Sequence, residues 1–251
     1  APLPDGMSVL VISDLTRMHR LETIRRDFTA NVSHELKTPI TAIKASLETL
    51  QDLACSRDEQ CSQFLDMAVR GTTRLESILA DLLSLARIEE EERAGLKLEK
   101  INLDDLVHTI QTELSGRIND AGVVFERTGT AGIMIHAHPG LIRQAIYNLV
   151  DNAIKYGSSG GLVTVCTEQR NGSVAISVSD RGPGISERDR SRLFERFYRV
   201  DKARSRETGG TGLGLAIVKH IARAHGGTVY LAGQSQPGAQ FILEIPLSGQ
   251  R

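Results

Sequence analysis

The chain has 251 residues and a formal net charge of −1, so charge alone would draw it neither to nucleic acid nor to an anionic bilayer. Its three cysteines lack paired spacing, which argues against a disulfide framework or a zinc site and favours a reducing compartment. No apolar run approaches the ~20 residues that span a bilayer, no signal peptide is visible, and tryptophan is absent. We therefore expect a soluble chain, long enough for two domains, with no nucleic-acid partner.

The first residues predict one short strand, Ser8 to Ile12, followed by Asp14-Leu15-Thr16. This stretch resembles the last strand and exit motif of a PAS sensor domain. Residues 1–16 are therefore interpreted as the remnant of an upstream sensor domain, which would make the chain a fragment of a longer receptor. The alternative is an unstructured tail.

A long helix is predicted from Arg17 to about Ala54, because apolar residues recur at spacings of three and four: Val32, Leu36, Ile40, Ile43, Leu47 and Leu50. At roughly 100° per residue, His34 points about 200° away from Leu36 and should face solvent. Glu35 could hydrogen-bond one ring nitrogen and leave the other as a nucleophile. Thr38 lies one turn further on, and Pro39 should loosen the helix between them.

A second helix should begin near Asp58, after a short turn at residues 55–57. It carries a heptad-like pattern: Leu65, Ala68, Thr72, Leu75, Leu79, Leu82 and Ala86. Two antiparallel helices with such faces expose too much apolar surface as a monomer. We therefore expect a homodimer, in which two hairpins form an antiparallel four-helix bundle spanning residues 17–92.

The acidic run from Glu89 to Glu92 predicts the end of this helix, with a linker at residues 93–100 and a second domain at 101–248. Strands and helices then alternate without regular βαβ units, which predicts an α/β sandwich with one mixed sheet covered by helices on one face. The predicted strands are residues 122–126, 133–136, 162–169, 174–180, 228–231 and 240–245, and the predicted helices begin at Leu103, Pro139 and Leu213.

The helix that starts at Pro139 places four polar residues on one face, namely Asn148, Asn152, Lys155 and Tyr156. Amide oxygens suit Mg²⁺, and the ammonium of a lysine suits phosphate oxygens. The alternative is that an asparagine pair on a helix is only a capping or surface feature.

Asp180 ends a predicted strand and is followed by Gly182 and Gly184, which allow the backbone close to a ligand. A carboxylate at this place could accept a hydrogen bond from an exocyclic amine such as that of adenine. A plain strand-to-loop turn is the alternative.

A glycine-rich loop opens the last predicted helix, where free amides and the helix dipole can receive phosphate. The loop lacks the Lys-Ser/Thr ending of a P-loop and does not fit the dinucleotide fingerprint. It is therefore interpreted as a phosphate loop of another kind, with the residues Gly210, Thr211, Gly212, Leu213 and Gly214.

The sequence Ser33-His34-Glu35-Leu36-Lys37-Thr38-Pro39 resembles the phosphoacceptor box of bacterial sensor histidine kinases. The resemblance implies that His34 is phosphorylated, that Glu35 is its base and that Thr38 is a phosphatase determinant.

The three later segments resemble the N, G1 and G2 boxes of the histidine-kinase catalytic domain, whose fold is shared with gyrase, Hsp90 and MutL. Leu193 to Arg199 resembles the F box on the lid over the nucleotide, which adds Phe194 and Phe197 to the expected nucleotide site. The resemblance implies that Asn152 holds Mg²⁺, with Asn148 as an alternative ligand. It also implies that Asp180 reads adenine and that Arg199 approaches the γ-phosphate. The late loop Gly238 to Phe241 departs from the family pattern and is left out of the predicted site.

The resemblance, closest to the phosphate-sensor branch, implies a kinase that phosphorylates His34 from Mg²⁺-ATP and passes the phosphoryl group to an aspartate of a response regulator, which it would also dephosphorylate. The fragment would be the cytoplasmic portion of an inner-membrane sensor, anchored through segments absent from this chain. Two rivals are a gyrase-like ATPase that clamps a dimer and a catalytically silent dimeric scaffold.

Overall fold

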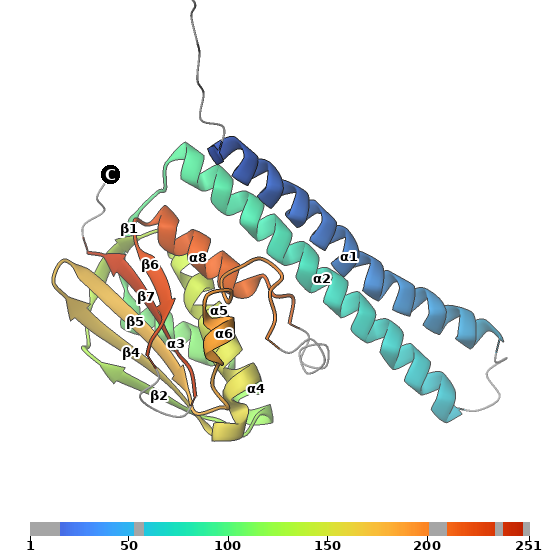
Figure 1. The fold of residues 1–251 in the computed structure, drawn as a ribbon. Coiled ribbons are helices and arrows are strands. Elements are labelled where there is room, and N and C mark those ends of the chain that lie inside the picture. The colour runs from blue at the N-terminus through green and yellow to red at the C-terminus, as the bar shows by residue number, and fades with distance from the viewer. Residues whose placement is uncertain (1–15, 53–57, 201–209, 234–237, 248–251) are drawn as a thin grey trace, which may run out of the picture. The chain divides into compact units, whose positions relative to one another are not determined.

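A computed structural model describes residues 16–52, 58–200, 210–233 and 238–247 (Figure 1). The predicted strand at residues 8–12 and the turn at residues 55–57 lie outside this part of the chain. Two compact units divide the chain, one up to Leu75 and one from Glu76 onward. None of the helices within the described residues is long and apolar enough to cross a membrane.

The first unit is a helical hairpin made of α1 (Thr16–Asp52) and the first part of α2 (Asp58–Ala94), as the periodicity predicts. The two helices approach closely at Gly71, where an added Cβ would lie 2.6 Å from Cγ1 of Ile43. Arg74 of α2 donates to the Glu35 carboxylate of α1 at 2.7 Å. A glycine and an ion pair therefore lie on the packed side of the hairpin.

The predicted heptad residues do not form one packed face within a single chain. Ala68 is buried, but Leu65 and Leu79 are 55% and 56% exposed, and Thr72 and Ala86 are exposed as well. Four of the seven predicted heptad positions are therefore not covered by the described residues of the chain.

The second unit contains a five-stranded sheet in the order β2-β4-β5-β7-β6. Its strands are β2 (Val124–Gly129), β4 (Leu162–Arg170), β5 (Ser173–Asp180), β6 (Thr228–Leu231) and β7 (Gln240–Pro246). Only the β2–β4 pair of this sheet is parallel, so the predicted mixed sheet is confirmed. A separate antiparallel pair joins β1 (Glu99–Asn102) to β3 (Met134–Ala137).

Helices cover the sheet on the side of its buried side chains (Figure 1). On β4, Val163 and Val165 are buried while Thr164 and Cys166 on the opposite face are half-buried. The helices are α3 (Leu103–Glu113), α4 (Ser115–Asp120), α5 (Pro139–Gly157), α6 (Glu187–Arg190) and α8 (Gly214–Ala224), with a 3₁₀ turn at Ser158–Gly160. Helix α5 packs on β4 and β5, and α8 packs on β6, β7 and α5. The predicted order of a helical part followed by an α/β domain is confirmed.

The second part of α2 belongs to this α/β unit. Leu85 and Ile88 are buried in its apolar core, and Ser84 accepts a hydrogen bond from Nε2 of Gln144 on α5 at 2.5 Å. The compact unit thus begins before the predicted linker at residues 93–100, which contains the end of α2 and the start of β1. The functional boundaries of the domains stay a prediction.

Candidate functional site

His34 lies on α1 and is exposed, as the helical period predicts. Among the described residues, no hydrogen bond partner is found for its ring. Thr38 is one turn further and is also exposed, and its hydroxyl donates to the His34 carbonyl at 3.1 Å. The imidazole is therefore accessible to a second molecule or domain.

The Glu35 carboxylate does not make the contact expected from the sequence. Its Oε2 accepts from Nη2 of Arg74 at 2.7 Å, so this oxygen is engaged across the hairpin and not with the ring of His34. The physical reason is that an arginine on the facing helix offers the carboxylate a charge-assisted hydrogen bond. The ring contact was a wrong expectation for this state, and Arg74 was missed.

The bond from Thr38 to the helix does not by itself assign a role to Thr38. Thr41 and Thr49 on the same helix donate to the carbonyl four residues earlier in the same way, at 2.9 and 2.8 Å. This is the usual habit of a threonine within a helix. The contact is therefore compatible with both a structural and a functional role.

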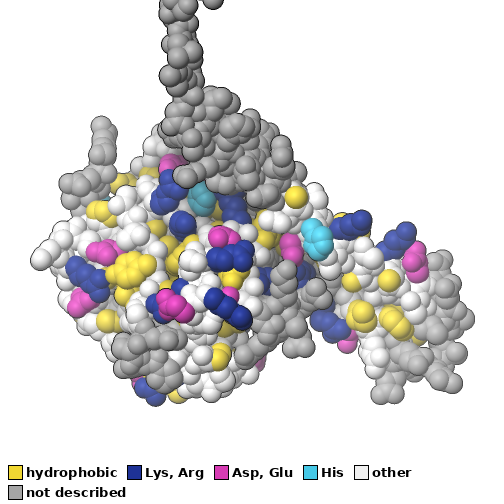
Figure 2. All heavy atoms as spheres, in the orientation of Figure 1, with side chains coloured by type: hydrophobic (Ala, Val, Ile, Leu, Met, Phe, Trp, Pro, Cys, Tyr) yellow, Lys and Arg dark blue, Asp and Glu magenta, His cyan; other side chains and the backbone are white. Residues whose placement is uncertain are grey.

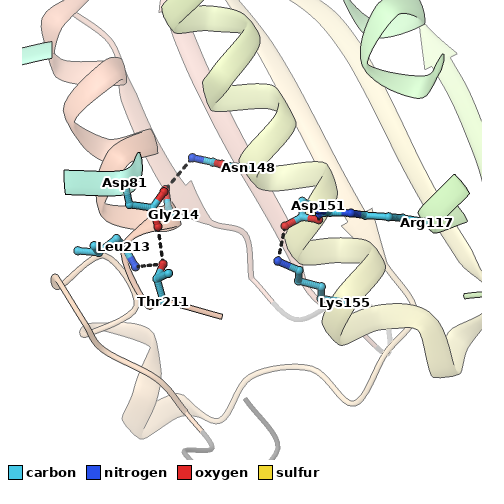
Figure 3. Close-up of polar contacts among 8 residues, drawn as sticks. All are labelled: Asp81, Arg117, Asn148, Asp151, Lys155, Thr211, Leu213 and Gly214. Atoms are coloured by element: carbon cyan, nitrogen blue, oxygen red, sulfur yellow. Dashed lines mark hydrogen bonds and ion pairs between the residues drawn. The ribbon is translucent and has the colours of Figure 1, made fainter. Parts of the chain in front are cut away.

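Helix α5 brings Asn148 of the predicted polar face to the first residue of α8. The amide nitrogen of Asn148 donates to the carbonyl of Gly214 at 3.4 Å (Figure 3). Asn152, one turn further along α5, is half-buried. The two asparagines thus differ: Asn148 ties α5 to the glycine loop, whereas Asn152 makes no hydrogen bond with its side chain among the described residues.

Lys155 was expected on a phosphate, but in the structure its ammonium is bound to Asp151. Nζ lies 2.6 Å from Oδ2 of Asp151, and the guanidinium of Arg117 also pairs with this carboxylate (Figure 3). Asp151 is only 8% exposed, so its charge has to be compensated within the protein. Asp151 therefore holds Lys155, and Arg117 shares the charge of that carboxylate; the sequence reasoning missed both residues.

Asp180 ends β5 in a crowded place. Its Oδ1 accepts from the N–H groups of Gly182 at 2.8 Å and Ala239 at 3.3 Å. A Cβ on Gly157 would lie 2.2 Å from Cβ of Asp180, so only a glycine fits beside it. Burial raises the pKa of this carboxyl, against the two amide hydrogen bonds that lower it. The late loop was left out of the predicted site, but the structure places Ala239 directly on Asp180.

The glycine-rich loop meets both α5 and the predicted lid segment. A Cβ on Gly210 would lie 2.5 Å from the hydroxyl of Tyr156, so these two predicted residues are neighbours. Gly212 has φ +75°, and its carbonyl accepts from the N–H of Phe197 at 2.9 Å. Phe197 itself has φ +64°, which is rare and strained for an aromatic residue. The loop and the F-box segment are thus locked together through their backbones.

The remaining residues of the predicted site differ in their surroundings. Phe194 packs its ring edge-to-face against Phe241 of β7, with centroids 6.2 Å apart. Gly184 has φ +75°, and Arg199 is half-buried. Leu213 is fully buried and precedes α8, whose first turn has no side-chain cap. The start of α8 therefore presents backbone amides that no side chain of the cap residue occupies.

Thr211 joins the loop to α2, which the sequence did not predict. Its hydroxyl donates to Oδ2 of Asp81 at 2.5 Å and accepts from the N–H of Leu213 at 3.2 Å (Figure 3). Asp81 and Thr211 are separated by 130 positions in the sequence, so no local sequence pattern could predict this pair.

The raised pKa of Asp180 predicts a stability effect. Because ionisation is disfavoured in the fold, this carboxyl costs stability as the pH rises from its usual value near 3.8 through its raised pKa. Asp180→Asn should therefore raise the melting temperature of the nucleotide-free chain by a few degrees at pH 7, since the amide oxygen still accepts both N–H bonds.

This stabilisation should vanish as the pH falls towards the ordinary carboxyl pKa, and melting curves across the acidic range measure it. Glu126→Gln, which neutralises an exposed carboxylate on β2, is the control and should change the melting temperature little. A gain for Asp180→Asn that is independent of pH would contradict the explanation.

Two known protein families match different parts of the chain. Residues 24–91 match the His Kinase A (phospho-acceptor) domain, and residues 137–249 match the histidine kinase-, DNA gyrase B- and HSP90-like ATPase. Both matched ranges contain the site residues described above. The predicted resemblance is therefore shown for the helical part and for the α/β part separately.

Whole proteins with the same arrangement are similar over nearly the entire chain. The sensor-like histidine kinase SenX3 of Mycolicibacterium smegmatis is 40% identical over 95% of this chain and 62% of its own length. The phosphate regulon sensor protein PhoR of Pseudomonas aeruginosa is 34% identical over 93% of this chain and 52% of its own length. The structure of full-length ShkA in complex with AMPPNP has a TM-score of 0.62 at 28% identity, covering 90% of this chain and 47% of ShkA.

The chain thus spans roughly half to three-fifths of the length of the curated relatives that it matches. The part that it shares with them contains both matched domains. The chain thus contains a phosphoacceptor domain of the His Kinase A type and an ATPase domain of the histidine kinase, DNA gyrase B and HSP90 type, and over nearly its whole length it is similar to sensor histidine kinases.

Proposed function

We propose that this chain is an ATP-dependent protein-histidine kinase that phosphorylates His34 and passes the phosphoryl group to an aspartate of a response regulator. The observation that carries the proposal is the exposed imidazole of His34 within a phosphoacceptor domain, on a chain that also holds an ATPase-type nucleotide site. The two sites lie in different units, as a kinase with an internal substrate requires.

The residues around Asp180 and the glycine loop fit a nucleoside triphosphate. Because Gly157 and Gly182 have no side chain, the backbone can pack directly against Asp180, which fixes the carboxylate that we assign to a base. The start of α8 offers uncapped amides for phosphate oxygens. We assign adenine to Asp180 and the phosphates to the loop Gly210 to Gly214, with Tyr156 beside it and Gly184, Phe194, Phe197 and Arg199 on the lid side.

Mg²⁺ suits the oxygen of Asn152, because this hard cation takes few protein ligands and keeps water and phosphate oxygens as the rest. When bound, it would neutralise phosphate charge. Asn148 is the weaker candidate, since its amide is already engaged with Gly214. Lys155, held at the site by Asp151, adds a second positive charge near the phosphates.

The transfer itself forms a bond between a ring nitrogen of His34 and the γ-phosphorus while the bond from that phosphorus to the ADP oxygen breaks. The proton of the ring has to leave in the same reaction. Glu35 can take it, because Arg74 occupies Oε2 of the carboxylate and leaves Oε1 for the ring. Arg74 would then act as a positioning residue for the base. Transfer of this kind depends mostly on placement and charge neutralisation.

We propose that two copies pair through the hairpin. In the first unit Leu65 and Val69 of α2 are both more than half exposed. Figure 2 shows apolar side chains at the surface of the hairpin, beside charged ones. Exposed apolar surface on a helical hairpin is what a four-helix bundle of two copies would bury.

The response regulator is proposed to dock on α1 just beyond His34, where its aspartate can reach the phosphohistidine. A shallow groove in this region is lined by Ile40, Ile43, Lys44, Leu47 and Glu48. Thr41 is exposed beside it. The groove combines apolar contact area with charged groups at its edge, as protein interfaces commonly do.

Two rival functions are separated by one measurement. A gyrase-like ATPase would release the label of γ-labelled ATP as free phosphate, and a silent scaffold would bind no ATP. The proposed kinase keeps an acid-labile, base-stable label on the protein and loses it when a receiver domain is added. Release of all label as phosphate by the chain alone would refute the kinase.

Thr38→Ala should preserve labelling of His34 and reduce dephosphorylation of the regulator by about 10-fold or more, because a hydroxyl one turn from His34 can orient the attacking water. Autophosphorylation and regulator dephosphorylation are measured side by side. Thr49→Ala removes the same kind of helical hydrogen bond further along α1 and is the matched control, which should leave both activities unchanged. An equal fall of both activities in the Thr38 variant would make Thr38 structural.

A further inference from the structure

The carboxylate of Asp81 on α2 is hydrogen-bonded to the glycine-rich loop. Oδ2 of Asp81 accepts from the hydroxyl of Thr211 at 2.5 Å, and the same hydroxyl accepts from the N–H of Leu213 just before α8 (Figure 3). Thr211 is 8% exposed, so this contact lies inside the unit and not on its surface. The acid is thus connected through a single hydroxyl to the start of the helix that would receive phosphate.

The charges around Asp81 are those of the proposed phosphate site. Burial raises its pKa, while the Thr211 hydrogen bond and the positive charge of Lys155 lower it. The charge of Asp151, which holds Lys155, raises it as well. Asp81 and Asp151 therefore both act on the one lysine that was expected to meet the phosphates.

We propose that Asp81 is a latch that holds α2 on the glycine loop in the nucleotide-free chain and that opposes the binding of a nucleoside triphosphate. This inference rests on the proposed function, because it takes the loop to be the phosphate site. Asp81 should weaken the binding of a polyanion, such as the triphosphate of ATP. It should not affect the binding of the adenine or the ribose.

The opposition follows from electrostatics in a buried place. Phosphate oxygens at the start of α8 would bring several negative charges close to the carboxylate of Asp81, where solvent screening is weak. The same hydroxyl that orders Leu213 is committed to Asp81. Nucleotide binding therefore has to neutralise Asp81, displace it from Thr211, or accept a lower affinity.

Several other contacts of α2 in this unit do not involve the loop. Leu85 and Ile88 are buried in the apolar core, and Ser84 bonds Gln144 of α5. These contacts can persist while the hydrogen bond at Asp81 opens. By linkage, whatever loosens Asp81 from Thr211 should tighten the nucleotide, and the nucleotide should loosen α2 at Asp81 to the same extent.

The test compares Asp81→Asn with the unchanged chain in calorimetric binding of Mg²⁺-AMPPNP. Asparagine keeps an oxygen that accepts from Thr211 and removes only the charge, so the fold should be retained. We expect about tenfold tighter binding, equivalent to about 1.4 kcal/mol. ADP should gain less than AMPPNP, and adenosine should not gain at all, since the effect scales with phosphate charge.

Ser84→Ala is the matched control, because it removes a hydrogen bond between the same helix and α5 without changing the charge near the loop. Its affinities for AMPPNP and adenosine should equal those of the unchanged chain. A general loosening of α2 would instead shift adenosine and AMPPNP alike in both variants. Hydrogen exchange gives a second readout: AMPPNP should speed exchange of the α2 amides around Asp81 in the unchanged chain.

Equal AMPPNP affinity of the unchanged chain and Asp81→Asn, or weaker binding by the variant, would overturn the latch. So would a gain of the same size for adenosine. Failure of the proposed function has a different signature, since the unchanged chain would then bind neither ADP nor adenosine. If Asp81→Asn melts at a much lower temperature than the unchanged chain, the hydrogen-exchange experiment on the unchanged chain decides alone, and absence of faster exchange on α2 refutes the proposal.

Discussion

A His34→Gln variant is expected to carry no acid-labile, base-stable label after incubation with γ-labelled ATP, a complete loss against the unchanged chain. Glutamine keeps a polar side chain on the exposed face of α1 but has no ring nitrogen to attack phosphorus. Its affinity for Mg²⁺-AMPPNP should stay within about twofold of the unchanged chain, because the nucleotide residues all lie in the second unit.

The control for this experiment is another exposed histidine. His108 on α3 is exposed and belongs to the second unit, so His108→Gln should be labelled as strongly as the unchanged chain. Label that survives in His34→Gln with the same acid lability would move the acceptor to another histidine. Loss of both labelling and AMPPNP binding would mean that the substitution damages the nucleotide site, contrary to the separation of the two units.

Regular periodicity made most of the fold predictable. The helix α1 and the strand β6 at Thr228–Leu231 were predicted with nearly the observed ends, because the spacing of their apolar residues matches the secondary structure that they form. The strand β1 was missed, since its residues Glu99–Asn102 are largely polar and exposed and have no pattern of their own. It exists through its antiparallel pairing with β3, which is a long-range contact.

The packing of the hairpin could not be read from apolar residues alone. Leucines at positions 65 and 79 suggested a heptad face, yet both side chains are mostly exposed in the single chain. The packed side instead has Gly71, whose missing side chain gives space to Ile43, and Arg74, which is neutralised by Glu35. A glycine and an arginine do not count as core residues in a hydrophobic pattern, although their contacts hold the helices together.

The sequence predicted many residues of the site but few of the contacts between them. Asn148, Tyr156, Gly210 and Gly214 were named from motifs, and the structure places Asn148 on Gly214 and Tyr156 beside Gly210. Their partners were not named: Asp151 fixes Lys155, Ala239 bonds Asp180, and Asp81 bonds Thr211. Each partner comes from a different segment or lacks a motif, so only the folded chain shows it.

The same contrast decides which asparagine should hold the cation. The amide nitrogen of Asn148 is tied to Gly214, whereas the side chain of Asn152 makes no hydrogen bond among the described residues. Asn148→Ala should therefore lower stability by about 1 kcal/mol, as for a lost hydrogen bond, while Mg²⁺ still strengthens AMPPNP binding.

Asn152→Ala is expected to abolish the effect of Mg²⁺ on nucleotide binding. Mg²⁺ takes few protein ligands at such sites, so removing one oxygen should weaken Mg²⁺-AMPPNP binding on the order of 100-fold. The decisive measurement is AMPPNP affinity with Mg²⁺ and with EDTA for the unchanged chain, Asn152→Ala and Asn148→Ala. The Asn152 variant should bind equally in both conditions, and adenosine should bind all three chains alike. If Asn152→Ala keeps the gain from Mg²⁺ while Asn148→Ala loses it, the metal ligand is Asn148, and its bond to Gly214 must open when the cation binds.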